Sequence, residues 1–150
     1  MELSGQRNIG FPGSNCMPSH GKGVIAGAAD LTPDGFLSLF AEDGVIDRIG
    51  QPFVGHNAIR ALMEARPRDR VTRHLLSPPV IEVVGPNDAT GRSYFSLYDG
   101  IGEPDGAVLP LKAPVLVGEF DQIYRRNLGE WKIARHKVSA VFRPTEGIRA

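Results

Sequence analysis

The amino-acid sequence predicts an α+β domain, in which helices cover one side of a curved β-sheet. Helix signals gather between residues 30 and 67, whereas residues 70–142 are rich in the β-branched and aromatic runs that strands favour. Pro78 and Pro79 interrupt the first of those runs, which predicts a bulge or a bend rather than a straight central strand. A sheet bent in this way can form a concave face around a cavity, and we expect the functional site there.

Composition limits the class of protein. The chain has 150 residues, of which 41% are hydrophobic, and this suits one globular domain with its own core. Basic and acidic residues each total 17, so no net charge favours binding to nucleic acid or to a membrane surface, and we expect neither partner. Cys16 is the only cysteine, which suits the reducing cytoplasm. We expect no membrane span, since no apolar run approaches about 18 residues, and no export signal.

Three parts are expected along the chain. Residues 1–22 are rich in glycine, proline and serine and lack apolar periodicity, which is typical of a flexible N-terminal arm. Residues 23–145 would form the domain, and residues 146–150 a short C-terminal tail. Residues 23–30, GVIAGAAD, could form one or two helical turns, although each of their two glycines costs about 1 kcal/mol relative to alanine.

The first firm helix signal lies in residues 30–44, DLTPDGFLSLFAEDG. Thr32 suits the N-cap and Pro33 the first helical position, so we expect a helix over about residues 33–41. A helical period of apolar residues predicts its buried face, which consists of Phe36, Leu37, Leu39 and Phe40.

The next segments predict a short strand and a second helix. The strand is predicted over residues 44–50, GVIDRIG. The helix is predicted over residues 55–67, GHNAIRALMEARP, and ends at its proline. Long strands are then expected near residues 70–84, 88–99, 114–126 and 130–142, with hairpin turns at GPND and RNLGE.

Three stretches carry a family resemblance over about residues 30–143: FLSLFAEDGVIDRIGQPFVGHNAIRALM, RHLLS and GEFDQIYRRNLGEWKIARHKVSAVF. Their order and spacing are similar to those of SnoaL-like domains in the nuclear-transport-factor-2-like superfamily, which includes scytalone dehydratase and the polyketide cyclases. The resemblance implies a cone-shaped, curved mixed sheet closed by about three helices, with a ligand pocket inside the cone.

The resemblance also implies cofactor-free proton transfer by a histidine and an aspartate inside the cone. His74 lies where the dehydratase and dehydrochlorinase members keep the histidine, and Asp30 lies within about one residue of the expected aspartate. An imidazole with a pKa near about 6.5 can accept and return a proton at neutral pH, and a carboxylate can fix its tautomer. The sequence has no tyrosine beside Asp30, whereas family members often do, and this favours a pocket that binds without catalysis.

Strand alternation predicts the rest of the pocket. In the last strand, Ala134 and His136 would share one face with Lys132 and Val138, opposite Trp131, Ile133, Arg135 and Lys137. The resemblance places an arginine of the dehydrochlorinase pocket at His136, where histidine would make anion binding dependent on pH. The predicted substrate-binding residues are Ile46, Arg48, Ser93, Phe95, Leu97, Phe120, Gln122, Tyr124 and His136.

Each candidate also has a structural interpretation. His74 could bond a backbone carbonyl, Asp30 could cap a helix, and Arg48 could pair with Asp47 at the surface. His56 is not a candidate, and the four histidines lack metal-ligand spacing, so no metal site is predicted, and the family resemblance implies no cofactor.

Two functional hypotheses therefore remain open. The first is an enzyme, namely a dehydratase, isomerase or cyclase acting on a hydrophobic, cyclic or polyketide-like carbonyl compound. The second is a non-catalytic module that binds a small hydrophobic molecule or serves in dimerisation, and an accessory subunit is a weaker third. We also expect a homodimer formed through the convex face of the sheet, which would carry the apolar residues Val115, Val117 and Ile123.

Overall fold

The computed structural model describes residues 32–102 and 108–144. The elements in chain order are α1 (Pro33–Leu37), β1 (Phe40–Arg48), β2 (Gln51–Val54), α2 (Gly55–Glu64), β3 (Arg70–Leu76), β4 (Val80–Val83), β5 (Asp88–Ile101), β6 (Leu116–Asn127) and β7 (Glu130–Phe142). The expected arm, the short helical segment over residues 23–30 with Asp30, and the C-terminal tail lie outside the described residues.

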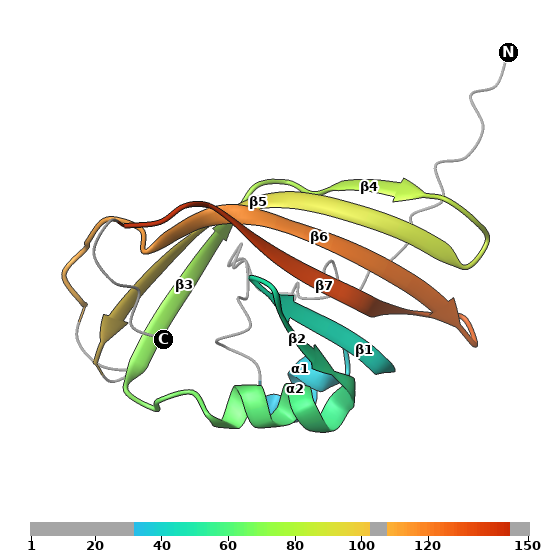
Figure 1. The fold of residues 1–150 in the computed structure, drawn as a ribbon, viewed down its shortest axis with the longest axis horizontal. Coiled ribbons are helices and arrows are strands. Elements are labelled where there is room, and N and C mark those ends of the chain that lie inside the picture. The colour runs from blue at the N-terminus through green and yellow to red at the C-terminus, as the bar shows by residue number, and fades with distance from the viewer. Residues whose placement is uncertain (1–31, 103–107, 145–150) are drawn as a thin grey trace, which may run out of the picture.

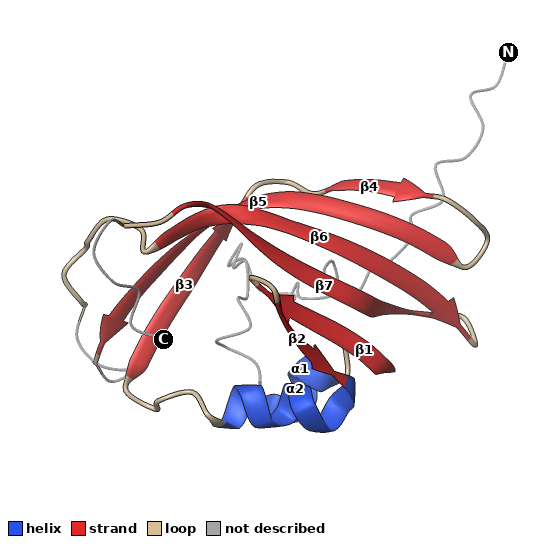
Figure 2. Ribbon diagram, in the orientation of Figure 1, coloured by secondary structure: helices blue, strands red, loops and turns tan. Residues whose placement is uncertain are grey.

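The seven strands form one mixed sheet. Its order is β2-β1-β7-β6-β5-β3, with β4 also paired to β5. The β1–β7 pair is parallel and every other pair is antiparallel. The sheet arches over α1 and α2, which lie on its concave side near β1 and β2 (Figure 1; Figure 2 shows the helices in blue). This arrangement confirms the α+β class with a curved mixed sheet, and the described residues contain two helices.

Helix α1 begins as predicted and ends early. The Thr32 hydroxyl accepts a hydrogen bond from the Gly35 backbone N–H at 3.1 Å, and Pro33 occupies the first turn. The prediction that the helix reaches residue 41 is wrong. The Ile133 N–H donates to the Leu39 carbonyl at 2.8 Å and Phe40 is in register with Ile133, so pairing with β7 takes this segment into β1.

The main core lies between the helices and the sheet. Ile59 of α2 is fully buried, and Phe40 is only 3% exposed, although it is buried from a strand rather than from a helix. The cluster comprises Leu37, Phe40, Ile46, Ile59, Ala89, Tyr124 and Ile133. It therefore fixes α1 and α2 against one end of the concave face. In the described part of the chain, no helix is long and apolar enough to cross a membrane.

The predicted bend at Pro78 and Pro79 divides the single strand expected over residues 70–84. Strand β3 pairs with the second half of β5, and β4 pairs with the first half. Between them, the Ser77 N–H donates to the Tyr94 carbonyl, and the Ser77 hydroxyl accepts from the Tyr94 N–H, each at 2.9 Å. The serine hydroxyl thus takes the place of a backbone carbonyl as the acceptor for Tyr94, next to the two prolines that end the β3 ladder.

Strand β7 contains a bulge that overturns the predicted alternation. Ile123 pairs with Arg135 but Tyr124 pairs with Ile133, so Ala134 has no partner opposite it. An extra residue shifts the two-residue period by one. Ile133 therefore lies on the same face as His136, and the prediction that they face opposite sides is wrong.

Candidate functional site

The pairing register brings the predicted site residues of the described chain to one face of the sheet. Cross-strand partners share a face, as do residues two apart along a strand. His74 pairs with Leu97 across β3 and β5, and Gln122 pairs with His136 across β6 and β7. His136 in turn pairs with Ile46. The same face carries His74 together with Ile46, Arg48, Ser93, Phe95, Leu97, Phe120, Gln122, Tyr124 and His136.

Aromatic rings join the two histidines. The rings of Phe95 and Phe120 stack with centroids 4.1 Å apart and planes 13° from parallel. The centroid of His74 lies 5.8 Å from that of Phe95 and 6.1 Å from that of Phe120, and His136 lies 4.6 Å from Phe120. Gly118 pairs with Phe95 and leaves room for its ring, since a Cβ on Gly118 would lie 2.9 Å from the Phe95 Cε1 atom. The two imidazoles therefore stand on either side of an apolar wall.

His74 carries an unpaired ring nitrogen. Its Nδ1 atom is buried and makes no hydrogen bond within residues 32–102 and 108–144. Burial lowers the pKa of His74, and the positive charges of Arg66, Arg48 and Arg70 lower it further. The ring is therefore neutral at pH 7, which leaves a nitrogen lone pair free to accept a proton.

His136 lies in a hydrogen-bonded chain with two neighbours on β6. The Gln122 amide nitrogen lies 3.0 Å from His136 Nδ1, and the Tyr124 hydroxyl donates to the Gln122 carbonyl oxygen at 2.6 Å. Burial, with a smaller contribution from the charge of His74, lowers the pKa of His136 to about 4. Burial also raises the pKa of Tyr124 to about 12. All three groups are thus uncharged at neutral pH.

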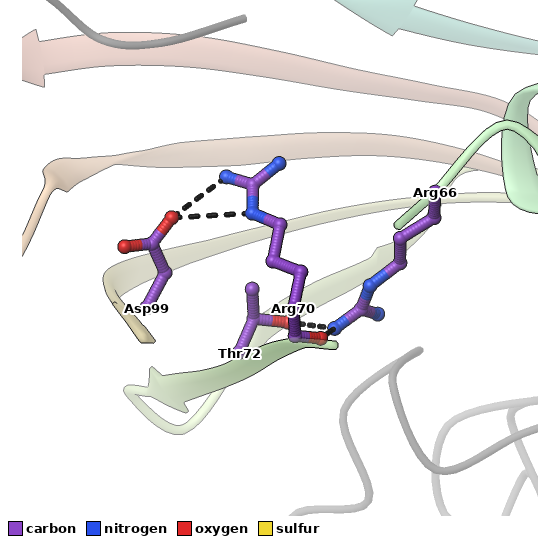
Figure 3. Close-up of polar contacts among 4 residues, drawn as sticks. All are labelled: Arg66, Arg70, Thr72 and Asp99. Carbon is purple, nitrogen blue, oxygen red and sulfur yellow. Dashed lines mark hydrogen bonds and ion pairs between the residues drawn. The ribbon is translucent and has the colours of Figure 1, made fainter. Parts of the chain in front are cut away.

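Sequence analysis missed a polar cluster beside His74, formed by Arg66, Arg70, Thr72 and Asp99 (Figure 3). Arg66 Nη2 donates to the Thr72 hydroxyl at 2.8 Å and to the Arg70 carbonyl at 3.0 Å. Arg70 donates through Nε and Nη2 to Asp99 Oδ2 at 3.2 and 2.9 Å. The alternation of Arg70, Thr72 and His74 along β3 could have indicated that they share a face, but not that Asp99 of β5 forms an ion pair with Arg70.

The structure also tests the surface pair suggested for Arg48, and it shows what His56 contacts. Asp47 pairs with Arg135 at 2.9 Å, so the surface pair of Arg48 with Asp47 is wrong. Arg48 is exposed and lies in register with Val138. The His56 ring nitrogen lies 3.2 Å from the Phe40 carbonyl oxygen, a contact that ties α2 to β1. Among the described residues, no three histidine, cysteine, aspartate or glutamate side chains gather closely enough to hold a metal ion.

Comparison with known proteins gives a consistent result. A family model for the SnoaL-like domain matches residues 27–137. No curated protein matches the chain.

Several solved structures share the fold. A variant of Rv3472, a Mycobacterium tuberculosis protein of unknown function, is 26% identical with a TM-score of 0.58; the match covers 75% of this chain and spans only 60% of that protein. A Novosphingobium aromaticivorans protein assigned as a scytalone dehydratase is 21% identical with a TM-score of 0.62, covering 79% of this chain and 76% of the other. A hexachlorocyclohexane dehydrochlorinase, LinA type 2, is 17% identical with a TM-score of 0.62, covering 78% of each chain.

Proposed function

The chain belongs to the SnoaL-like domain family, and on this premise we propose that it is a cofactor-free enzyme acting on a small hydrophobic carbonyl compound. The reaction would be a dehydration, isomerisation or cyclisation that begins with removal of a proton by His74. The observation that carries the proposal is the neutral, half-buried His74, which lies beside stacked phenylalanine rings and whose buried Nδ1 has no partner in the described residues. A dehydratase and a dehydrochlorinase among the similar structures support this general kind of chemistry.

The chemistry of the proposed first step is simple. His74 takes a proton from the carbon next to the substrate carbonyl, and the electrons of that C–H bond move to the carbonyl oxygen to form an enolate. Positive charge near a developing oxyanion lowers the barrier, and Arg48, Arg66 and Arg70 supply a positive field at His74. The protonated imidazole then returns its proton to another carbon in an isomerisation or to a departing hydroxyl in a dehydration. In a cyclisation the enolate carbon attacks a second carbonyl, whose oxygen takes the proton. In this proposal Asp30 orients the His74 ring, inside a cone closed by about three helices.

Enolisation can be measured without the natural substrate. The probe is 1-tetralone, a cyclic aromatic ketone, whose exchange of α-protons for deuterium in D₂O is followed by proton NMR. Removing a general base lowers a rate by about 10²- to 10⁴-fold. We therefore expect the protein to accelerate exchange, and His74→Ala to lose this acceleration while keeping its circular dichroism spectrum. His56→Gln is the matched control and should keep the rate. An unchanged rate in His74→Ala would show that His74 is not the base.

A binding module without catalysis is the second candidate function. The observation that favours it is that the sequence has no tyrosine beside Asp30, whereas SnoaL-like family members often have one there. The two candidates differ in their response to Asp30→Asn. In an enzyme this change slows exchange about as much as His74→Ala, and the double variant loses little more, because the two groups act as one unit. In a binding module, neither change affects exchange.

We further propose a cytoplasmic homodimer that forms through the convex face. On this face Ile123 is 46% exposed and Tyr94 is 59% exposed, and covering these apolar side chains would be favourable. Sedimentation at micromolar concentration should show a dimer that Ile123→Glu weakens. A monomeric wild-type protein would exclude this assembly. The proposed location rests on the single cysteine of the sequence.

A further inference from the structure

Strands β6 and β7 hold a chain of three polar side chains that the proposed proton abstraction does not use. Tyr124 and Gln122 are two residues apart on β6, and Gln122 is in register with His136 on β7. All three point to the concave face, where Tyr124 belongs to the buried core at 5% exposure. The far end of this chain is therefore anchored in the best-packed part of the molecule.

The distances define which atom donates in each hydrogen bond. The 2.6 Å separation between the Tyr124 hydroxyl and the Gln122 carbonyl oxygen fits an O–H···O bond, whereas N–H···O bonds run from about 2.7 to 3.2 Å. The Gln122 side-chain oxygen is thus the acceptor, and the amide nitrogen faces His136 Nδ1 at 3.0 Å. An amide N–H can only donate, so Nδ1 must offer a lone pair, and the ring proton resides on Nε2.

We propose that Tyr124 and Gln122 are positioning residues that hold His136 as a neutral Nε2–H donor, which binds the carbonyl oxygen of the substrate. This role rests on the proposed function, because it supplies the partner for the oxygen on which the enolate charge develops. His74 and His136 then lie on either side of Phe120 with different roles. His74 accepts the proton from carbon, and His136 donates a hydrogen bond to the carbonyl oxygen.

The arrangement also specifies the class of ligand. Nε2 makes no hydrogen bond to the described residues, so a ligand can use it. Because His136 is uncharged, its donor suits a neutral ketone better than a carboxylate, which would favour a cation at this position. The half-buried Phe120 ring beside His136, backed by the buried Phe95 ring, favours a flat, apolar body next to that ketone. The structure thus points to an aromatic or polycyclic ketone.

The first test reads the tautomer of His136 directly, by ¹⁵N NMR of the imidazole at pH 7 in the absence of ligand. We expect a single neutral form with the proton on Nε2. In Gln122→Leu, which lacks the donor, a measurable population with the proton on Nδ1 should form, and Tyr124→Phe should show a smaller change. A wild-type ring protonated on Nδ1, or a Gln122→Leu spectrum identical to wild type, would overturn the proposal.

The second test compares two probes that differ by one oxygen, 1-tetralone and tetralin, with dissociation constants measured by NMR titration. Loss of one neutral hydrogen bond should weaken 1-tetralone binding by roughly 5- to 10-fold in His136→Phe, while tetralin binding stays within twofold. Equal effects on both probes would overturn the donor role. Should His136→Phe not fold, Gln122→Leu gives the same comparison with a smaller loss. If neither probe binds the wild type, the proposed function fails. The tautomer measurement still decides whether Tyr124 and Gln122 hold His136 in the Nε2–H form.

Discussion

The two imidazoles of the concave face have the same charge state for different reasons. At His136, neighbouring side chains of β6 provide a hydrogen-bond partner, and burial is the main cause of its lowered pKa. At His74, burial is again the largest cause, but three arginines add to it, and Nδ1 makes no hydrogen bond to the described residues. One ring is therefore held by its neighbours, whereas the other is surrounded by apolar and positively charged groups.

The two rings therefore differ in how firmly they are held and in how available their nitrogen lone pairs are. A hydrogen-bonded ring has one tautomer and one orientation, which suits a fixed donor. A buried ring nitrogen without a partner costs free energy, and such a cost is retained in proteins chiefly at functional sites. The His136 end of the face therefore contributes to stability, whereas under the proposed function the His74 end would supply the proton acceptor at some cost in stability.

The largest expected effect comes from Gly118, at the His74 end. A Cβ there would overlap the Ser139 carbonyl oxygen and lie 2.9 Å from Phe95, and neither a paired backbone nor a stacked ring can move away easily. Gly118→Ala should cost about 3 kcal/mol of unfolding free energy in urea titrations. Gly91→Ala, the matched change opposite Gln122, should cost about 1 to 2 kcal/mol, because its Cβ meets the ends of the Ile81 and Tyr124 side chains. The reverse order would contradict this account.

The second effect is a dependence of stability on pH. The pKa of His136 is lowered from 6.5 to about 4 in the folded chain, so below pH 6.5 the unfolded chain takes up a proton that the folded chain refuses. Stability from this group is thus complete above pH 6.5 and is lost as the pH falls toward 4, by about 2 kcal/mol after allowing for partial solvent access. Urea titrations at pH 7 and pH 4.5 should show a smaller loss for His136→Phe than for the wild type. Parallel profiles would show that His136 does not contribute.

Replacing each histidine by phenylalanine compares the two ends directly. His136→Phe leaves the Gln122 amide nitrogen without its acceptor and should cost about 1 to 2 kcal/mol at pH 7. His74→Phe removes a buried polar atom that has no partner in the described chain, and should leave stability unchanged or slightly raised. Thermal unfolding of the two variants measures this contrast. A strongly destabilised His74→Phe would indicate a structural histidine.

The smallest expected effect is on the pKa of His74, which depends on the charge of Arg70, whereas that of His136 does not. The charge of Arg70 lowers the pKa of His74 but is not among the causes of the lowered pKa of His136. Arg70→Gln should therefore raise the pKa of His74 in an NMR titration. It should leave the tautomer of His136 unchanged. A pKa of His74 that does not move would show that Arg70 does not contribute to the lowering, which would then come from burial, Arg66 and Arg48.

Much of the concave face could be predicted because strand alternation is a strict local rule. Once β5, β6 and β7 were recognised from their composition, residues such as Phe95, Phe120 and Gln122 followed on one face. The bulge at Ala134 could not be predicted, because a shift in pairing changes no composition along the strand. The end of α1 was missed for a related reason, since Phe40 is apolar in either context and only its pairing with β7 decides.

The polar neighbours of His74 could not be predicted from the sequence either. Arg70 and Asp99 are 29 residues apart, and their ion pair depends on the register of β3 against β5. Their residue types alone do not distinguish a pair on the concave face from two solvated charges. The role of Asp30 stays a prediction, because it lies outside the described residues.

Prolines at both margins of the sheet have a consequence for solubility. Strand β2, at one margin, contains Pro52, and Pro78 and Pro79 separate β3 from β4 at the other. Strands of other chains can pair with the unpaired N–H and C=O groups of an edge strand, which is a common route to aggregation. Proline opposes this pairing because it has no N–H to donate. Copies of this protein should therefore resist joining into a continuous intermolecular sheet. The same prolines that bend the site's outer wall would also protect the chain from amyloid-like polymerisation.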